Sequence, residues 1–213
     1  RILNVNDRAS NMATLAELGE YPIALEICYN IIKYWVRTIQ FDENSLTFEC
    51  YRENMMLSQQ GNPCWIKAVK DILCAIGMEE IWYNQNLIGI RESNFLRNVR
   101  SKLNDVYKMQ WTLDMYDDDR KNKESKNKLR TYRTFKNVYS FEKYLHMNDV
   151  DGRTNIVRFR ISAHNLNVEK MRHSNVYIPV GHRICTMCNE NAVEDEFHVL
   201  MNCNAYSIIR QEY

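Results

Sequence analysis

Apolar residues recur at helical spacing along most of the chain, and strand-like alternation of apolar and polar residues is hard to find. Ile23, Ile27 and Ile31 fall on one face of a helix, and Val69 and Leu73 belong to a second apolar stripe. Glycine and proline, which interrupt helices, number only 6 and 3. The pattern therefore predicts an all-α fold.

The first 116 residues are expected to form an N-terminal helical bundle. Gly19 and Gly77 stand where helices are expected to end, and Asn62 and Ser93 are expected to cap the helices that follow them. Residues 78–91 are ambiguous. The expected helices of this bundle cover residues 8–18, 22–39, 44–59, 64–76 and 93–111.

A run of charged residues without apolar side chains, residues 117–128, predicts an exposed linker. The carboxylates of Asp117 to Asp119 are consecutive and point in different directions, so we do not expect a metal site there. A basic helical region is expected over residues 129–183, with Asp151 and Gly152 breaking the chain before a helix over 154–164. A small zinc-binding motif and a terminal helix are expected over residues 184–213.

The charge is distributed unevenly, although the net charge is only +1. Residues 120–183 contain 15 Lys and Arg against 5 Asp and Glu, whereas residues 184–213 contain 1 against 5. A basic segment between acidic flanks is typical of polyanion binding, and the alternative is a solvated helical surface. The candidate phosphate-binding residues are Arg153, Arg158, Arg160, Lys170, Arg172 and Arg183.

A set of candidate metal ligands, Cys185, Cys188, His198 and Cys203, has the spacing Cys-x2-Cys-x9-His-x4-Cys. Zinc prefers four such ligands, and a closed set of four leaves no position open for catalysis, so the sequence predicts a structural zinc site. His182 lies three residues before Cys185 and is an alternative to His198. The remaining possibility is that reduced thiols and imidazoles share this spacing by coincidence.

Four further cysteines, Cys28, Cys50, Cys64 and Cys74, lie in apolar or helical contexts. They are expected to be buried free thiols rather than a disulfide framework. A reducing compartment, the nucleus or the cytoplasm, is therefore expected. No apolar run approaches the ~20 residues that a bilayer crossing takes. The chain starts with Arg1 rather than Met, which is typical of a fragment.

Several short strings carry a family resemblance. Toward the C-terminus they are Arg158-Phe-Arg-Ile-Ser-Ala-His164, Glu169-Lys170-x-Arg172, Ile178-Pro179-x3-Arg183-x-Cys185-x2-Cys188 and Glu194-Asp-Glu-x-His198-x4-Cys203-x2-Tyr206. Toward the N-terminus they are Ala16-Glu-Leu-Gly-Glu-Tyr-Pro22 and Ile31-Ile-Lys-Tyr-Trp35. Together they resemble the C-terminal region that follows the reverse transcriptase of non-LTR retrotransposons of the LINE type, in particular jockey-like elements.

This resemblance implies a helical region after the polymerase thumb, ending in a zinc knuckle that helps to bind template RNA or target DNA. The four candidate ligands match the family's metal ligands, and the matched recurrent basic positions are Arg158, Arg160, His164, Arg172 and Arg183. The chain has no Tyr/Phe-x-Asp-Asp string in a strand context. The fragment is therefore expected to be non-catalytic, and its parent protein is expected to be an RNA-directed DNA polymerase.

The expected function is that of a nucleic-acid-binding module, with RNA or DNA and the polymerase domain of the same polyprotein as partners and no membrane. The alternative is a helical protein-interaction scaffold with a zinc clip, which a large exposed apolar patch on residues 20–110 would favour. An enzyme is a third hypothesis. The sequence contains no nucleophile elbow, phosphate loop or His-Glu-x2-His string to support it.

Overall fold

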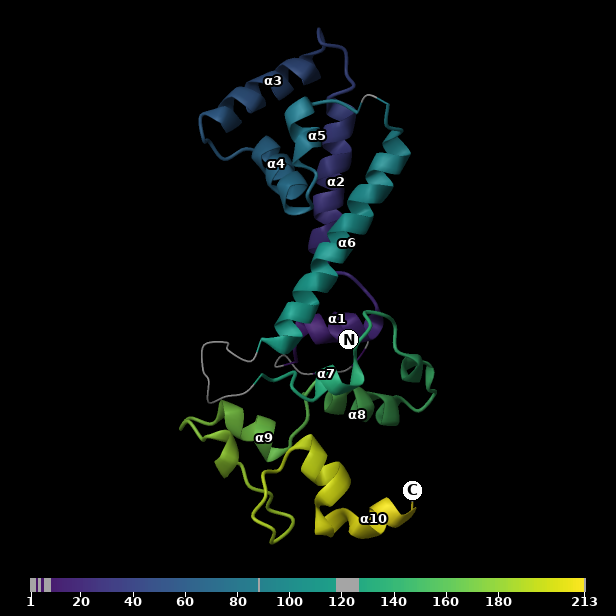
Figure 1. Cartoon of the computed structure of the whole chain (residues 1–213), viewed down its shortest axis with the longest axis vertical. Coiled ribbons are helices and arrows are strands. Elements are labelled where there is room, and N and C mark those ends of the chain that lie inside the picture. The colour runs from purple at the N-terminus through teal and green to yellow at the C-terminus, as the bar shows by residue number, and fades with distance from the viewer. Residues whose placement is uncertain (1–2, 4, 6–8, 88, 118–126, 213) are drawn as a thin grey trace. The chain divides into compact units, whose positions relative to one another are not determined.

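The computed structural model describes residues 3, 5, 9–87, 89–117 and 127–212, and it confirms the all-α class (Figure 1). Over these residues the extended pairings are two isolated antiparallel bridges, Leu18 with Phe141 and Ile184 with Val193. The chain divides into two compact units. We call Tyr21–Met109 the central unit, and Arg1–Glu20 together with Gln110–Tyr213 the terminal unit.

The central unit is built on an apolar core. Its elements are α2 (Ile23–Thr38), α3 (Leu46–Gln59), α4 (Trp65–Ala75), α5 (Glu79–Asn84) and the first part of α6 (Glu92–Tyr116) (Figure 1). Ile32 and Trp35 of α2, Leu73 of α4 and Val99 of α6 are completely buried in one cluster. The Trp35 indole donates a hydrogen bond to the Tyr51 hydroxyl at 3.3 Å, so its polar edge is satisfied inside the core.

The apolar stripe predicted for α2 is buried only in its second half. Ile23 is 76% exposed and Ile27 is 54% exposed, whereas Ile32 and Val36 are completely buried. Helical periodicity shows which residues share a face of a helix, but it does not show how far along that face a neighbouring element extends. The first two turns of α2 therefore present apolar side chains at the surface of the central unit.

Two of the predicted helix caps are wrong. Cys64 rather than Asn62 occupies the N-cap of α4, and α6 begins at Glu92, which places Ser93 inside its first turn. A further cap, which was not predicted, is at the start of α3. There the Ser45 hydroxyl accepts a hydrogen bond from the Phe48 amide at 3.2 Å. The ambiguous residues 78–91 contain the short helix α5.

The terminal unit consists of short elements. They are α1 (Asn11–Leu18), α7 (Tyr132–Phe135), η1 (Lys143–His146), α8 (Val150–Arg160), α9 (Asn167–Lys170), η2 (Met171–His173), η3 (Val180–His182), η4 (His198–Asn202), η5 (Asn204–Tyr206) and α10 (Ser207–Glu212), besides the end of α6. Its apolar cluster joins Ala13 of α1 and Trp111 of α6 to Tyr132 of α7 and Val157 of α8.

Asp151 and Gly152 do not break the chain, contrary to the prediction, because they lie in the first turn of α8. The Asp149 carboxylate caps this helix by accepting hydrogen bonds from the Asp151 and Gly152 amides at 3.1 and 3.0 Å. A Cβ atom at residue 152 would collide with that carboxylate, so glycine here allows the cap to close.

The division into units differs from the division that the sequence suggested. Residues 1–116 were expected to form one bundle, but α1 and the last residues of α6 pack in the apolar cluster of the terminal unit. Residues 129–183 and 184–213, expected as separate regions, belong to that same unit. The greater part of the expected linker, residues 118–126, lies outside the described residues.

The four cysteines outside the metal motif are free thiols, as predicted, but they are not buried. Cys50 and Cys74 are exposed, and Cys28 and Cys64 are half-buried. Each lies on or beside an amphipathic helix, where a shift of one position moves a side chain from the core to the surface.

Candidate metal centre and the basic segment

The structure brings Cys185, Cys188, His198 and Cys203 together. One ligand atom from each residue lies within 4.8 Å of the ligand atoms of the other three. The Sγ atoms of Cys185 and Cys203 are 4.0 Å apart, and Cys188 Sγ lies 3.4 Å from His198 Nε2. Three of the four side chains are buried and Cys188 is half-buried. These residues form a group that can hold a metal ion.

The first ligand pair lies on a small hairpin. Ile184 and Val193 form its antiparallel bridge, and the Cys185 amide donates to the Ala192 carbonyl at 2.8 Å. Asn191 turns the chain with a φ of 55°, in the left-handed region that asparagine tolerates better than most residues. The hairpin thus fixes the backbone on both sides of the loop that contains Cys185 and Cys188.

In the second ligand pair, His198 begins one wide helical turn, η4, which has π-helical geometry, and Cys203 directly follows the last residue of that turn. The His198 amide donates to the Asp195 carboxylate at 2.8 Å, and the Cys203 amide donates to the His198 carbonyl at 2.7 Å. Arg210 of α10 donates to the Cys203 carbonyl at 2.7 Å, which ties the end of this turn to the terminal helix. The turn is therefore closed at both ends by hydrogen bonds.

The two ring nitrogens of His198 face different neighbours, one inside the group of four candidate ligands and one outside it. Its Nε2 faces Cys188, and its Nδ1 lies 3.9 Å from a carboxylate oxygen of Glu190. Metal-binding histidines commonly place a carboxylate behind the nitrogen that does not bind the metal. The exposed residue His182, the alternative ligand, is not part of the group that the described residues form.

The donor set suits a tetrahedral ion. Zinc–sulfur bonds of about 2.3 Å place tetrahedral ligand atoms about 3.8 Å apart. The separations of 4.0 and 3.4 Å, and the 4.8 Å within which all four ligand atoms lie, are close to that value. Three thiols and one imidazole form a closed set of soft and borderline ligands, whereas magnesium and calcium take oxygen ligands.

Glu196, between the two ligand pairs, binds a second set of residues. It is 1% exposed and accepts hydrogen bonds from Arg130 at 2.8 Å and Ser162 at 3.2 Å. His164 Nδ1 accepts from the Leu166 amide, so its Nε2 is the nitrogen that donates to Glu196, at 2.9 Å. Burial raises the pKa of Glu196, but His164 and the charge of Arg130 outweigh burial and lower the pKa to about 2.

The neighbouring residue Glu194 also points inward. Its carboxylate accepts from the Asn167 amide at 2.8 Å, and its backbone carbonyl accepts from the Val168 amide at 3.2 Å. The acidic string Glu194 to Glu196 lies at the start of the helical turn that begins at Glu196, and it also connects the metal motif to residues 130 and 162–169.

Three of the candidate phosphate-binding arginines are engaged within the protein. Arg160 holds the buried carboxylate of Glu17 with two hydrogen bonds of 3.0 and 3.1 Å. Arg172 makes two hydrogen bonds to Glu169, of 2.9 and 3.0 Å. Arg153 donates to the Leu145 and Met147 carbonyls.

Arg183 is 1% exposed, and its guanidinium donates to the Ile178 and Val168 carbonyls. Burial lowers the pKa of Arg183, and the nearby charge of Arg172 lowers it further. This arginine is a structural element of the interior rather than a surface contact for phosphate. Arg158 is half-buried, and Lys170 is the exposed member of the candidate set.

The partners of these cations are not predictable from the local sequence pattern. Glu17, Glu142, Glu169 and Glu196 all bind arginine or lysine, and three of the four are buried. Glutamate is almost never fully buried unless it is paired, but its partner is often distant in sequence. Arg160 and Glu17 are 143 positions apart.

Comparison with protein families, with curated proteins and with solved structures found no match in any of the three. None of the helices in the described part of the chain has both the length and the apolar character that a membrane crossing takes.

Proposed function

We propose that this chain is a nucleic-acid-binding module with a structural zinc site, from the C-terminal region of a non-LTR retrotransposon reverse transcriptase protein. The observation that carries the proposal is the convergence of three thiols and one imidazole beside a segment rich in arginine and lysine. The module is non-catalytic by itself in this proposal, because a closed ligand set leaves no position for a substrate.

The role of the zinc ion is to fix the segment that contains Glu194 and Glu196. Through that segment it would hold Arg130 and the turn at residues 162–165 in place. The nucleic-acid surface then comprises the exposed cations of the terminal unit rather than its internal arginines. Among the described residues they include Lys143 and Lys170.

The zinc site is tested by the metal content of the purified chain. We expect one zinc ion per wild-type chain, a loss of zinc in His198→Ala, and full zinc content in His182→Ala. Equal zinc content in both variants would contradict the ligand set. Thiolate and imidazole ligands bind zinc in preference to harder divalent ions. The zinc content measured in the presence of added Mg²⁺ should therefore be unchanged.

Nucleic-acid binding is tested by titrating labelled single-stranded RNA and double-stranded DNA with the zinc-loaded chain at several salt concentrations. Each neutralised phosphate releases counterions, so the affinity should fall steeply as salt rises. Affinity that does not change between low and high salt, or no binding to either polymer, would refute this function.

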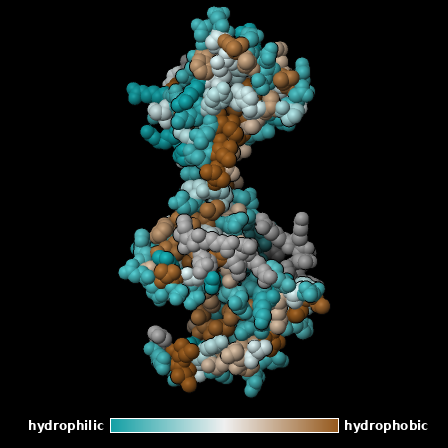
Figure 2. Space-filling model, turned by 180° about the vertical axis from the view of Figure 1, so that it is seen from behind, coloured by the Kyte–Doolittle hydropathy of each residue, from teal (hydrophilic) through white to brown (hydrophobic). Residues whose placement is uncertain are grey.

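A protein-interaction scaffold is the second candidate, and one observation favours it. Ile27, Ile31 and Tyr34 of α2 line a shallow apolar groove with Trp65 of α4, and Ile27 and Tyr34 are each more than half exposed. Figure 2 shows hydrophobic side chains gathered on the surface of the central unit. If neither nucleic acid binds, replacing Ile27 and Tyr34 with serine and measuring association with a polymerase domain separates the two candidates.

A further inference from the structure

The three thiols of the candidate metal centre differ in their access to solvent. Cys185 is 4% exposed and Cys203 is completely buried, whereas Cys188 is half-buried. Cysteines that respond to oxidants are commonly accessible thiols that lie next to a second thiol. Cys188 is therefore the ligand thiol that a dissolved oxidant reaches first.

The two buried thiols lie close to each other and to Cys188. The Sγ atoms of Cys185 and Cys203 are 4.0 Å apart, and the Cys188 Sγ lies within 4.8 Å of both. The sulfur–sulfur bond of a disulfide is about 2.05 Å long, so any two of these sulfurs need to approach by about 2–3 Å to form one. All three thiols are therefore placed to react with one another.

The possible disulfides differ in what they would connect. Cys185 and Cys188 belong to the same hairpin loop, so a bond between them would join no separate elements. Cys203 follows the end of η4, 18 positions after Cys185, and a bond between these two would close a loop that contains Glu194 and Glu196. A cross-link restricts the chain more when the loop that it closes is longer. A bond between two buried sulfurs is also less open to reduction than an exposed one.

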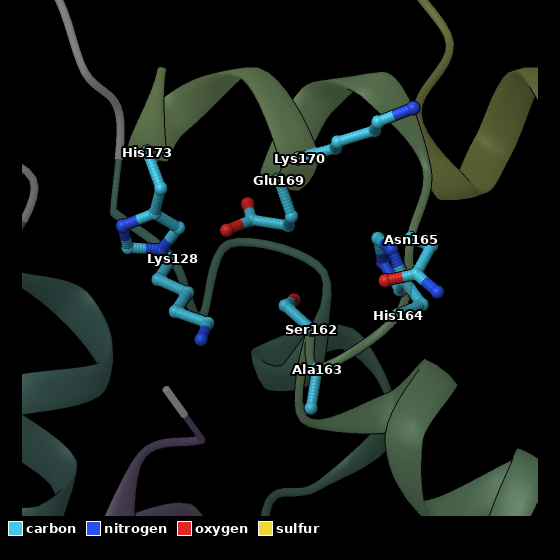
Figure 3. A pocket seen from close by; sticks show the side chains of 8 residues that line it. All are labelled: Lys128, Ser162, Ala163, His164, Asn165, Glu169, Lys170 and His173. Carbon is cyan, nitrogen blue, oxygen red and sulfur yellow. The ribbon is translucent and has the colours of Figure 1, made fainter. Parts of the chain in front are cut away.

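The carboxylates inside this loop hold other parts of the terminal unit. Glu196 accepts hydrogen bonds from Ser162 at 3.2 Å and His164 at 2.9 Å, and Figure 3 shows both of these residues on the loop that follows α8. Glu194 accepts a hydrogen bond from the Asn167 amide at 2.8 Å. A bond between the two buried thiols would fix both ends of the segment that contains these carboxylates, as a bound metal ion would.

We propose that Cys188 is an oxidation site at which a peroxide reacts, and that the reaction leaves the candidate metal centre with a disulfide between Cys185 and Cys203. The proposal rests on the zinc site of the proposed function, because a metal-bound cysteine is a thiolate, the form that reacts with oxidants. Disulfides in reducing compartments are usually transient and respond to redox changes. The terminal unit then has a reduced, metal-bound form and an oxidised, metal-free form, and the same segment is closed in both.

The reaction takes three steps. The Cys188 sulfur attacks hydrogen peroxide, the O–O bond breaks, and a sulfenic acid and one water form. The Cys185 sulfur displaces the sulfenic oxygen as a second water and forms a disulfide with Cys188. Cys203 then attacks the Cys185 sulfur, which gives the final disulfide and returns Cys188 as a free thiol. In sum, two thiolates lose two electrons, and one hydrogen peroxide takes up these electrons and two protons to give two waters. One thiol and one imidazole remain as ligands, too few to retain zinc.

The test treats the full zinc-loaded chain with hydrogen peroxide. A colorimetric chelator measures the zinc that is released, and mass spectrometry maps the disulfides after digestion at low pH, which prevents thiol exchange. Cys188→Ser removes the proposed oxidation site, and this variant is loaded at saturating zinc and checked for folding by circular dichroism. The matched control is Cys50→Ser/Cys74→Ser, which removes two exposed thiols of the central unit and leaves all four candidate ligands in place.

We expect the wild-type chain and the control to release their zinc at the same rate. Both should contain the disulfide between Cys185 and Cys203, with Cys188 recovered as a free thiol. Cys188→Ser should release zinc about tenfold more slowly, because its remaining ligand thiols are buried. The oxidised, zinc-free wild-type chain should keep its protection from hydrogen exchange over residues 129–212, and a reductant added together with a chelator should abolish that protection.

The results that would overturn this proposal are distinguishable from a failure of the proposed function. If the purified chain takes up no zinc, the zinc site of the proposed function fails and the metal-bound form fails with it. If zinc is bound and peroxide does not release it, or if the mapped disulfide includes Cys188, the oxidation site fails alone. Equal rates of zinc release from Cys188→Ser and wild type have the same meaning. If Cys188→Ser does not fold, the disulfide map of the wild-type chain decides.

Discussion

The two units of this protein are stabilised in different ways. The central unit buries aliphatic and aromatic side chains, among them Trp35 and Leu73. The terminal unit buries charged side chains and the candidate metal ligands as well. Among the described residues, Thr38 is the one buried polar residue of the central unit, and those of the terminal unit are Glu17, Lys136, Thr154, Ser162, Asn167, Glu169, Arg183, Glu194, Glu196 and His198.

This difference indicates how each unit depends on its surroundings. Burial of apolar surface is favourable and non-directional, so the core of the central unit does not depend on a charged partner being in place. A buried charge is costly unless its partner is in place, and the partners of the terminal unit come from segments far apart in sequence. The metal motif contributes Glu194 and Glu196 to that arrangement, so we expect the terminal unit to depend on the metal and the central unit not to.

The largest expected effect follows from removing the metal with a chelator or with Cys203→Ser. Structural zinc contributes about 10–16 kcal/mol of apparent folding free energy in zinc-finger peptides, which matches or exceeds the whole stability of a typical domain. We therefore expect residues 129–212 to lose protection from hydrogen exchange while residues 21–109 keep theirs. Mass spectrometry of exchanged peptides measures both regions in one experiment.

The matched control for this experiment is Cys74→Ser, which alters an exposed thiol of the central unit. It should leave exchange in both units unchanged. Protection of residues 129–212 that survives both the chelator and Cys203→Ser would show that the terminal unit folds without the metal, and the comparison between the units would fail.

The second largest effect is expected from a variant that destabilises the central unit and leaves the metal site of the terminal unit unchanged. Leu73→Ala creates a cavity at a completely buried position of the central unit and should lower its free energy of unfolding by about 2–5 kcal/mol. Denaturant unfolding followed by tryptophan fluorescence measures the loss. Zinc content should stay at the wild-type value, because the changed side chain lies in the other unit. Leu57→Ala, at a 43% exposed position of α3, is the control and should cost much less. A loss of zinc in Leu73→Ala would mean that the two units fold as one.

Glu196→Gln should weaken the terminal unit by about 3 kcal/mol, because Arg130 loses one of its two carboxylate partners inside the protein. The loss is measured by thermal unfolding of the zinc-loaded chain. Glu212→Gln, at an exposed position of α10, is the control with the same change of charge. Equal stabilities of the two variants would mean that the buried charge network contributes little beyond the metal.

The parts of this structure that the sequence predicted are local. The apolar stripe of α4 and the spacing of the four metal ligands each lie within about twenty residues, and the structure brings the ligands together as that spacing indicated. Within so short a segment, the order of residues already restricts the geometry.

The parts that the sequence did not predict depend on distant residues. Counting arginines between residues 120 and 183 identified a basic segment, but it could not show that Arg160 faces Glu17 or that Arg183 lies in the interior. A surface arginine and a buried paired arginine look the same in sequence, because the difference is made by the partner. The same limit explains why the cap at Asn62 was wrong, since tertiary packing decides where a helix starts.

The smallest effect concerns helix caps, and it should be the same in both units. Ser45 caps α3 in the central unit, and Asp149 caps α8 in the terminal unit. Replacing either residue with alanine should cost about 1 kcal/mol, because each loses hydrogen bonds from amides at a helix start. Thermal unfolding of the two variants measures the cost, and Ser45→Thr and Asp149→Ser should recover most of it by restoring an acceptor oxygen. Equal costs would show that the units differ in how their cores are held rather than in how their helices form. A cap in the terminal unit that costs several times more would instead place part of the difference in its short helices, which have few turns over which to spread the loss.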